Sequence, residues 1–210
     1  MALPVKWVSR DEFLKKYVAR FRDLKGADTG LPDSDIKGHY KMILNVFGFE
    51  PPAGADAVNP VGDDAQALIS PKAGFSVGFL KAPPGNGPVL HNHDTNETFI
   101  PLGGIWRFTW EDNPAHEEFI DLGPYDTVSF PPGVPRSFVN VEPTPGDTQG
   151  LLMAVVAGDA PLSEAMPGIK GLLATIAKGE LPMLADEPKS AASTCGNAVV
   201  LTTKAGGFGG

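Results

Sequence analysis

The sequence HNHDTNETFIPLGG, residues 91–104, places two histidines two positions apart and a glutamate four positions after the second histidine. In an extended segment His91 and His93 project from the same face, because side chains alternate with a period of two. The next three residues, DTN, favour a turn that brings Glu97 to face the same space. Two imidazoles and a carboxylate are ligands that suit Zn, Mn, Fe, Ni or Cu. The segment therefore predicts a metal site formed by His91, His93 and Glu97.

Short segments of β-strand character surround this stretch. Alternating or β-branched apolar residues predict strands at 65–70, 75–82, 97–102, 104–110, 118–122, 126–130, 136–142 and 150–158. The 25 glycines and 21 prolines imply many turns, and EDNPAHEE, residues 111–118, is typical of a hairpin connection. Turn signals at intervals of about 8–12 residues are typical of a β-sandwich or a small barrel.

The N-terminal part predicts a helix and a further strand. Ser9 and Glu12 form a capping box, and apolar residues recur at helical spacing as far as Leu24, before Gly26 supplies a stop. We expect this helix to pack against the body of the protein or against a partner subunit. The apolar run 39–49 fits a strand or a short helix, and its valine and phenylalanine content favours the strand.

The character of the sequence changes after residue 160. Apolar residues at helical spacing within 161–182 predict a short helix that begins at Pro167. Residues 197–203, NAVVLTT, are compatible with one more strand. We interpret Cys195 as unreactive, since it has no sequence neighbour that would lower its pKa.

Charge and composition exclude several classes of function. The chain of 210 residues has 17 basic and 25 acidic residues, a net charge of −8 and no basic run, which argues against nucleic-acid binding. No apolar run reaches the roughly 18 residues that cross a bilayer, and the N-terminus lacks the apolar core of a secretion signal. With a single cysteine no intramolecular disulfide can form. We therefore expect a cytoplasmic protein that does not bind membranes.

Two motifs in the sequence resemble those of the cupin superfamily. The first motif of that family has a glycine, two histidines, a glutamate and a glycine at fixed spacings, which Gly85, His91, His93, Glu97 and Gly104 match. In the second motif Asp126, Pro131, Gly133 and Asn140 match, and Tyr125 stands in place of a glycine. Arg136 stands where the family has its last metal-binding histidine. The resemblance covers residues 85–140, and the flanking strands extend it to 66–158.

The resemblance implies an all-β fold, the cupin double-stranded β-helix or jelly-roll barrel, with flanking N- and C-terminal helices. Residues 1–60 would form a helical and extended segment that packs on the barrel. Residues 61–160 would form the barrel, and 161–210 a C-terminal helix and tail. By analogy, and because two-fold oligomers are common, we expect a homodimer.

Arg136 leaves three arrangements open. Arginine is effectively always protonated and cannot ligate a metal. If Arg136 points inward, it repels a divalent ion about 4–6 Å away by several kcal/mol at an effective dielectric constant near 20, unless an anion lies between them. It can instead pair with Glu97 and replace the metal. It can also turn outward to Glu142 or the solvent and leave a three-ligand site open.

The aromatic residues and the other histidines complete the candidate list. Trp106, Phe108 and Phe138 are candidate substrate-binding residues that also suit the core of a barrel. An aromatic lining favours an apolar or aromatic substrate. We interpret His116 as a solvated residue of the hairpin connection, and His39 as within reach of the barrel mouth. Neither is our choice for the missing ligand.

The residues support two hypotheses from different classes. In the first, the protein is a metal-dependent enzyme, a dioxygenase-type oxidoreductase, in which His91, His93 and Glu97 hold Fe(II) or else Mn, Ni, Cu or Zn. Arg136 would be the catalytic residue that binds an anionic group of a small aromatic substrate or stabilises developing negative charge. An isomerase or lyase fits the same residues. In the second, a non-catalytic barrel, with or without a metal, binds a small anionic ligand through Arg136 or serves as an interaction scaffold.

Overall fold

The computed structural model describes residues 3–28, 31, 33, 34, 36–51, 59–62, 65–114 and 116–167. Within these ranges the helical elements are α1 (Arg10–Lys16) and the 3-10 helix η1 (Phe21–Asp23). The strands are β1 (Gly26–Ala27), β2 (Met42–Phe47), β3 (Phe75–Ala82), β4 (His91–His93), β5 (Glu97–Gly103), β6 (Ile105–Asn113), β7 (His116–Leu122), β8 (Val128–Phe130), β9 (Arg136–Glu142), β10 (Gly150–Ala157) and β11 (Ser163–Ala165). No helix in this part of the chain has the length and apolar character needed to cross a membrane.

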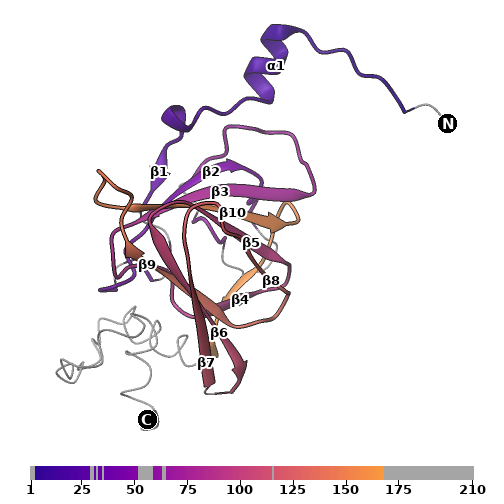
Figure 1. The fold of residues 1–210 in the computed structure, drawn as a ribbon. Coiled ribbons are helices and arrows are strands. Elements are labelled where there is room, and N and C mark those ends of the chain that lie inside the picture. The colour runs from indigo at the N-terminus through magenta and orange to yellow at the C-terminus, as the bar shows by residue number, and fades with distance from the viewer. Residues whose placement is uncertain are drawn as a thin grey trace.

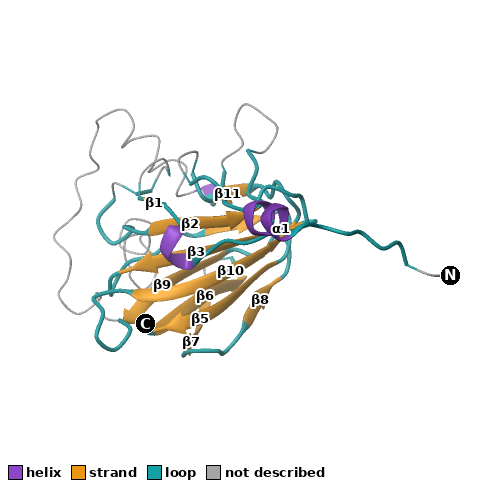
Figure 2. Cartoon of the chain, turned by 90° about the horizontal axis from the view of Figure 1, so that it is seen from above, coloured by secondary structure: helices purple, strands orange, loops and turns teal. Residues whose placement is uncertain are grey.

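The strands form two antiparallel sheets. One sheet has the order β1-β2-β3-β10-β5-β8, and the other has the order β11-β4-β9-β6-β7. Most neighbouring strands, such as β3 and β10 or β4 and β9, are distant in sequence, as jelly-roll connections require. Figures 1 and 2 show the strands gathered into one barrel-like body, from which α1 projects in Figure 1. The predicted all-β double-stranded β-helix is therefore confirmed.

The core lies between the two sheets. It includes Leu80, Phe99 and Leu152 from the first sheet and Trp106, Phe108 and Phe138 from the second. The ring of Phe99 lies 4.4 Å from that of Phe138 and 5.5 Å from that of Phe108, measured between centroids. Because these contacts cross from one sheet to the other, the aromatic cluster stabilises the packing of the two sheets.

The motif turns have a backbone geometry that glycine adopts most easily. Gly85, Gly104 and Gly133 have φ angles of 77°, 81° and 80°. Tyr125, which stands where the motif has a glycine, keeps the same left-handed geometry, with φ at 73°. It follows Pro124 in a turn closed by the hydrogen bond from Asp126 N–H to Gly123 O at 3.1 Å. Type II turns combine a proline with a positive φ in this way. The turn is thus retained without its glycine, at a cost of about 1–2 kcal/mol.

The N-terminal helix is shorter than its apolar pattern predicts. The predicted cap is present, because Ser9 Oγ accepts a hydrogen bond from Glu12 N–H at 3.2 Å. The helix nevertheless ends at Lys16, since Tyr17 leaves helical geometry with φ at −125°, and Gly26 opens β1 instead of stopping the helix. No residue of α1 is buried, so the expected packing against the described body is not observed.

Further differences and untested expectations concern segments outside the barrel motifs. Residues 65–70, predicted as a strand, contribute an isolated bridge between Ile69 and Phe47, because β1 already pairs with the start of β2. Residues 163–165 form β11, which pairs with β4 and was not predicted. The helix predicted to follow Pro167, the strand predicted at 197–203 and Cys195 lie outside the described residues.

Replacing Tyr125 with glycine should stabilise the protein by about 1 kcal/mol, because glycine adopts a positive φ without strain. The tyrosine side chain is 79% exposed and loses little contact when it is removed. Urea unfolding measures the change in the free energy of unfolding. Tyr125→Ala is the matched control, because it removes the ring and keeps the strained Cβ. Equal stability of the two variants would contradict this explanation.

Candidate functional site

The strands bring the three predicted metal ligands to the junction of the two sheets. His91 and His93 are the first and last residues of β4, in the second sheet, and both are buried. Glu97 is the first residue of β5, in the first sheet. The turn at 94–96 therefore carries the chain from one sheet to the other, as its DTN sequence predicts. The convergence of the three side chains follows from this crossing.

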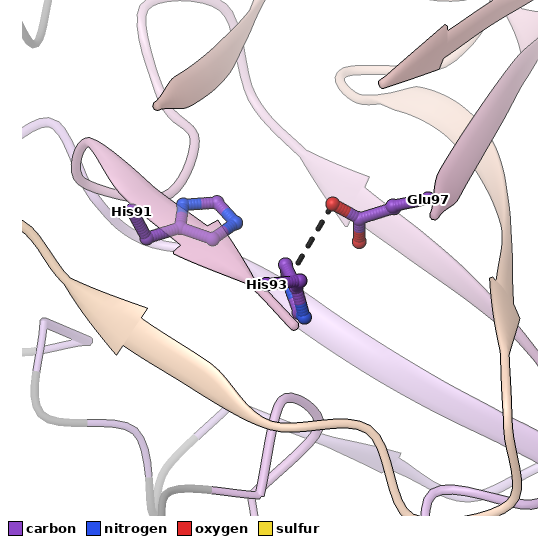
Figure 3. Close-up of side chains that lie close together, drawn as sticks. All are labelled: His91, His93 and Glu97. Atoms are coloured by element: carbon purple, nitrogen blue, oxygen red, sulfur yellow. Dashed lines mark ion pairs between the residues drawn. The ribbon is translucent and has the colours of Figure 1, made fainter. Parts of the chain in front are cut away.

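The three side chains meet in the barrel interior. Their ligand atoms lie within 4.8 Å of one another. His91, His93 and Glu97 are 8%, 2% and 5% exposed. Figure 3 shows the His91 ring and the Glu97 carboxylate pointing towards each other, with His93 beside them. The two imidazole rings are 5.2 Å apart, at an interplanar angle of 75°. The cluster is thus preformed and nearly closed to solvent.

A backbone contact fixes the orientation and tautomer of His91. Its Nδ1 atom lies 2.7 Å from the carbonyl oxygen of Val89. Because a carbonyl oxygen can only accept, Nδ1 carries the proton and Nε2 keeps its lone pair. Burial lowers the pKa of His91 to about 4, and the nearby His93 acts in the same direction. His91 is therefore a neutral imidazole at neutral pH, with Nε2 available to a metal.

His93 is also neutral, but it is held less firmly. Burial, followed by the charge of Arg136, lowers the pKa of His93 to about 3, against a weaker backbone interaction with Leu162. Its Nε2 atom lies 3.5 Å from Glu97 Oε2, the contact drawn as a dashed line in Figure 3. Because the imidazole is neutral, this contact is not a salt bridge at neutral pH. Across the described ranges, no group makes a well-formed hydrogen bond to His93 Nδ1.

Arg136 points into the site and pairs with Glu97. It is the first residue of β9, in register with His91 of β4 and Trp110 of β6, and it is fully buried. Its Nε and Nη2 atoms donate to Glu97 Oε2 at 3.1 and 3.0 Å. Its Nη1 atom donates to Val134 O at 3.0 Å. Of the three arrangements that the sequence leaves open, the structure has the pairing with Glu97, and the outward orientation is wrong.

The ion pair leaves part of each group unused. Both hydrogen bonds from Arg136 reach the same carboxylate oxygen, and no described residue hydrogen-bonds Glu97 Oε1. Of the five N–H groups of a guanidinium, three are engaged. Burial lowers the pKa of Arg136 and Glu97 opposes this effect, so the guanidinium stays charged. Arg136 and Glu97 therefore neutralise each other.

The donor set fits a divalent transition metal. Metal–ligand distances of about 2.0–2.2 Å place ligand atoms roughly 3–4 Å apart. The observed separations, all within 4.8 Å, need a small contraction. His91 and His93 are neutral, and among the described residues no hydrogen bond reaches Glu97 Oε1. Arg136 opposes a metal through its charge, without blocking the histidine nitrogens.

The predicted substrate-binding aromatic residues belong to the buried core next to the metal-ligand cluster. Trp106 and Phe108 are fully buried in the core, and the ring of Phe138 lies 6.4 Å from that of His91. Phe130, which sequence reasoning missed, has its ring centroid 5.9 Å from the guanidinium carbon of Arg136. Contact of these aromatic residues with a substrate stays a prediction.

The two other histidines are not part of this cluster. His39 is buried, and its Nδ1 atom is hydrogen-bonded to Gly87 O at 3.0 Å. His116 opens β7 and is exposed, with Nδ1 2.7 Å from Asp112 Oδ1. With Glu118 these two form a second, exposed group of possible metal ligands. Sequence reasoning missed this group because the register of the hairpin creates it.

Comparison with known proteins gives distant similarities. No family model and no curated protein matches the chain. Similar solved structures include DMSP lyase DddQ from Ruegeria pomeroyi DSS-3, with 23% identity over 45% of this chain and 45% of that chain, at a TM-score of 0.36. An RmlC-like cupin family protein from Methanocaldococcus jannaschii is 18% identical over 40% of this chain and 71% of that chain, at a TM-score of 0.35. An oxalate decarboxylase from Lactobacillus farciminis is 12% identical over 85% of this chain and 41% of that chain, at a TM-score of 0.47. The chain thus spans less than half of the lyase and of the decarboxylase, and TM-scores this low establish neither a family nor an activity.

Acidification should destabilise the metal-free protein. The pKa values of folded His91 and His93, about 4 and about 3, lie below the ordinary value of 6.5. As the pH falls, the histidines of the unfolded chain take up protons before those of the folded protein. The stability that the two neutral histidines contribute is therefore complete above pH 6.5 and is lost as the pH falls towards their pKa values in the folded protein. Each histidine should remove about 1.4 kcal/mol of unfolding free energy per pH unit in that window. Urea unfolding in the presence of a chelator, between neutral pH and about pH 5, measures the slope.

Matched histidine variants show which histidines cause the dependence of the unfolding free energy on pH. His91→Gln with His93→Gln should remove most of it and leave the part that comes from His39, whose pKa burial also lowers. His116→Gln should keep the full slope below pH 6.5, because the hydrogen bond to Asp112 raises the pKa of this exposed residue and so places its own contribution, of opposite sign, above that pH. An unchanged slope in the double variant would count against the neutral, buried histidines.

Arg136→Met should destabilise the metal-free protein by about 3–5 kcal/mol, because it leaves the Glu97 carboxylate buried without a counter-ion. Adding Glu97→Gln should recover most of the loss, since the second change removes the charge. Chemical denaturation of the wild type, both single variants and the double variant gives the coupling energy. Lys72→Met, which breaks the exposed 2.7 Å pair with Glu50, is the control and should have little effect. A buried pair that proved no more sensitive than this surface pair would argue against the assigned role.

Proposed function

We propose that this chain is a metal-dependent cupin enzyme that acts on a small anionic substrate, with dioxygenase-type oxidation as the first reaction to test. The observation that carries the proposal is the preformed set of His91, His93 and Glu97, whose ligand atoms lie within 4.8 Å. The two sequence motifs and the jelly-roll topology support the assignment to the cupins. Fe(II) suits a set of two histidines and one carboxylate best, and Mn, Ni, Cu and Zn are alternatives.

A divalent transition metal bound here would supply Lewis acidity and open coordination positions and, in the case of iron, redox chemistry towards dioxygen. The protein's own residues prepare the site. Burial keeps His91 and His93 unprotonated, so they can ligate at neutral pH. Arg136 holds Glu97 through Oε2 and makes no hydrogen bond to Oε1. The nearly closed interior excludes bulk water, which strengthens electrostatic interactions within it.

The charge of the site favours an anionic substrate. Without a metal, Arg136 and Glu97 cancel and both histidines are neutral. A divalent ion raises the net charge to about +2 in an interior where uncompensated charge is costly. A carboxylate or enolate would offset this charge, and the unused N–H groups of Arg136 match its oxygen atoms.

The same residues also suit a lyase or isomerase in which the metal acts as a Lewis acid. Such an enzyme would turn over its substrate without dioxygen, whereas a dioxygenase consumes dioxygen with each turnover. Oxygen uptake in the presence of small aromatic acids therefore separates the two classes of reaction.

A non-catalytic, metal-free barrel is the second candidate function, and the Arg136–Glu97 pair is the observation that favours it. Because Arg136 neutralises Glu97, the cluster is electrically balanced without a metal. Its buried histidines would then be polar groups in a site for a small anionic ligand.

Untagged protein purified under mild conditions should hold about one transition-metal ion per chain, measured by inductively coupled plasma mass spectrometry. His91→Ala should lower the metal content at least about tenfold, because it removes a ligand whose lone pair faces the site. Arg136→His should raise the metal affinity, because it removes a positive charge and adds an imidazole.

His116→Ala is the matched control for this measurement, because the exposed group at the β6–β7 hairpin should not hold the resident ion. Its metal content should equal that of the wild type. A wild type without metal, beside an Arg136→His variant that holds it, would overturn the enzyme proposal and favour the metal-free barrel.

A further inference from the structure

A second buried ion pair lies outside the metal-ligand cluster. Lys41 Nζ is 2.7 Å from Asp33 Oδ1, and the two side chains are 3% and 8% exposed. Lys41 also donates to His39 O at 3.2 Å. Both residues precede the barrel motifs in the sequence, and the proposed chemistry does not use them.

The other oxygen of Asp33 connects this pair to the site. Asp33 Oδ2 accepts a hydrogen bond from Val89 N–H at 3.0 Å. The carbonyl oxygen of the same residue, Val89, accepts the 2.7 Å hydrogen bond from His91 Nδ1. Burial raises the pKa of Asp33, but Lys41 and the Val89 N–H lower it overall, so the carboxylate stays charged. A continuous series of contacts thus joins Lys41, Asp33, Val89 and His91.

Stability alone does not account for this pair. Bringing two charges out of water costs several kcal/mol, and an apolar pair of similar volume is often as stable or more stable. What the charged pair adds is geometric: a carboxylate that reaches the backbone of the segment leading into β4. The neighbouring Gly87 is already held, because it donates to Gly38 O at 3.3 Å and its carbonyl contacts His39 Nδ1. Asp33 extends this anchoring to Val89, two residues before the ligand.

We infer that Asp33, supported by Lys41, is a positioning residue for His91. It holds Val89 so that the Val89 carbonyl keeps the His91 proton on Nδ1 and leaves Nε2 facing His93 and Glu97. The inference rests on the proposed metal site for its purpose, but the tautomer of His91 can be measured without a metal. Outer contacts of this kind affect metal affinity by about 10–100-fold in other proteins, and a contact one step further out should fall at the lower end.

Two double variants isolate the hydrogen bond to Val89. D33N/K41M removes both charges but keeps an acceptor oxygen for Val89 N–H. D33L/K41M removes the charges and the acceptor together. Nitrogen-15 NMR of the imidazole side chains in metal-free protein reports which ring nitrogen carries the proton. The chain has four histidines, so single His→Gln substitutions assign the signals. A zinc titration by competition with a chelator measures the metal affinity of each variant.

D33N/K41M should keep the wild-type His91 signal, whereas D33L/K41M should shift it towards a mixture of tautomers and weaken zinc binding by about tenfold. The His93 tautomer should change less than that of His91, because among the described residues no hydrogen bond joins His93 to Asp33 or Val89. Lys72→Met with Glu50→Leu removes an exposed ion pair of the same length and should change neither the His91 signal nor the zinc affinity. Should D33L/K41M fail to fold, D33S/K41M shortens the acceptor side chain and provides the same comparison.

Two results would overturn the inference: an unchanged His91 signal in D33L/K41M, or an equal change in both double variants, which would assign the effect to lost charge. A failure of the proposed function is distinguishable from both. If wild-type protein does not bind zinc while the His91 signal follows the expected pattern, the positioning role stands and the metal proposal fails.

Discussion

The ion pair between Arg136 and Glu97 is the interaction on which the rest of the site depends. It joins β9 of one sheet to β5 of the other, in the interior where neither charge reaches water. A charge in such a place needs its partner, so the pair sets how the two sheets meet at this point. His91 and His93 face the same interior from β4. Their neutrality follows first from burial, which also makes the ion pair necessary, and the charge of Arg136 lowers the pKa of both in the same direction.

The details of this pair decide whether an arginine excludes a metal. A guanidinium that bonded both carboxylate oxygens would compete directly for the ligand. Here both hydrogen bonds converge on Glu97 Oε2, the oxygen that lies 3.5 Å from His93 Nε2, and no hydrogen bond from a described residue reaches Oε1. A metal would therefore bind through Oε1 or displace Arg136 from Oε2. An electrostatic penalty can be offset by an anion, whereas an occupied ligand atom cannot be shared so easily. Arg136 would weaken the binding of a metal ion on its own. It would therefore favour a metal ion that binds together with an anionic molecule.

Local sequence patterns predicted those parts of the structure that neighbouring residues determine. Alternation in 75–82 and 136–142 predicted β3 and β9, and the HxH spacing followed by a DTN turn predicted the convergence on Glu97. The direction of Arg136 could not be predicted, because it depends on the register of β9 against β4 and β6. The contact from Asp33 to Val89 spans 56 residues, and no local pattern encodes it. The helix α1 is shorter than its apolar spacing predicts, and it buries no residue against the described part of the chain, so local spacing alone did not set its length.

The presence of arginine at position 136 has a consequence for how such sites change over generations. The arginine codons CGU and CGC differ from the histidine codons CAU and CAC in the middle base alone, so a single nucleotide substitution converts one residue into the other where these codons are used. In this barrel the arginine already has a partner in Glu97, and an imidazole at the same place would join the donor set. Either residue gives the carboxylate a neighbour with which it can interact. With a histidine at position 136, a bound metal would replace the guanidinium as the counter-charge of Glu97, so the gain of the ligand and the gain of the metal are coupled.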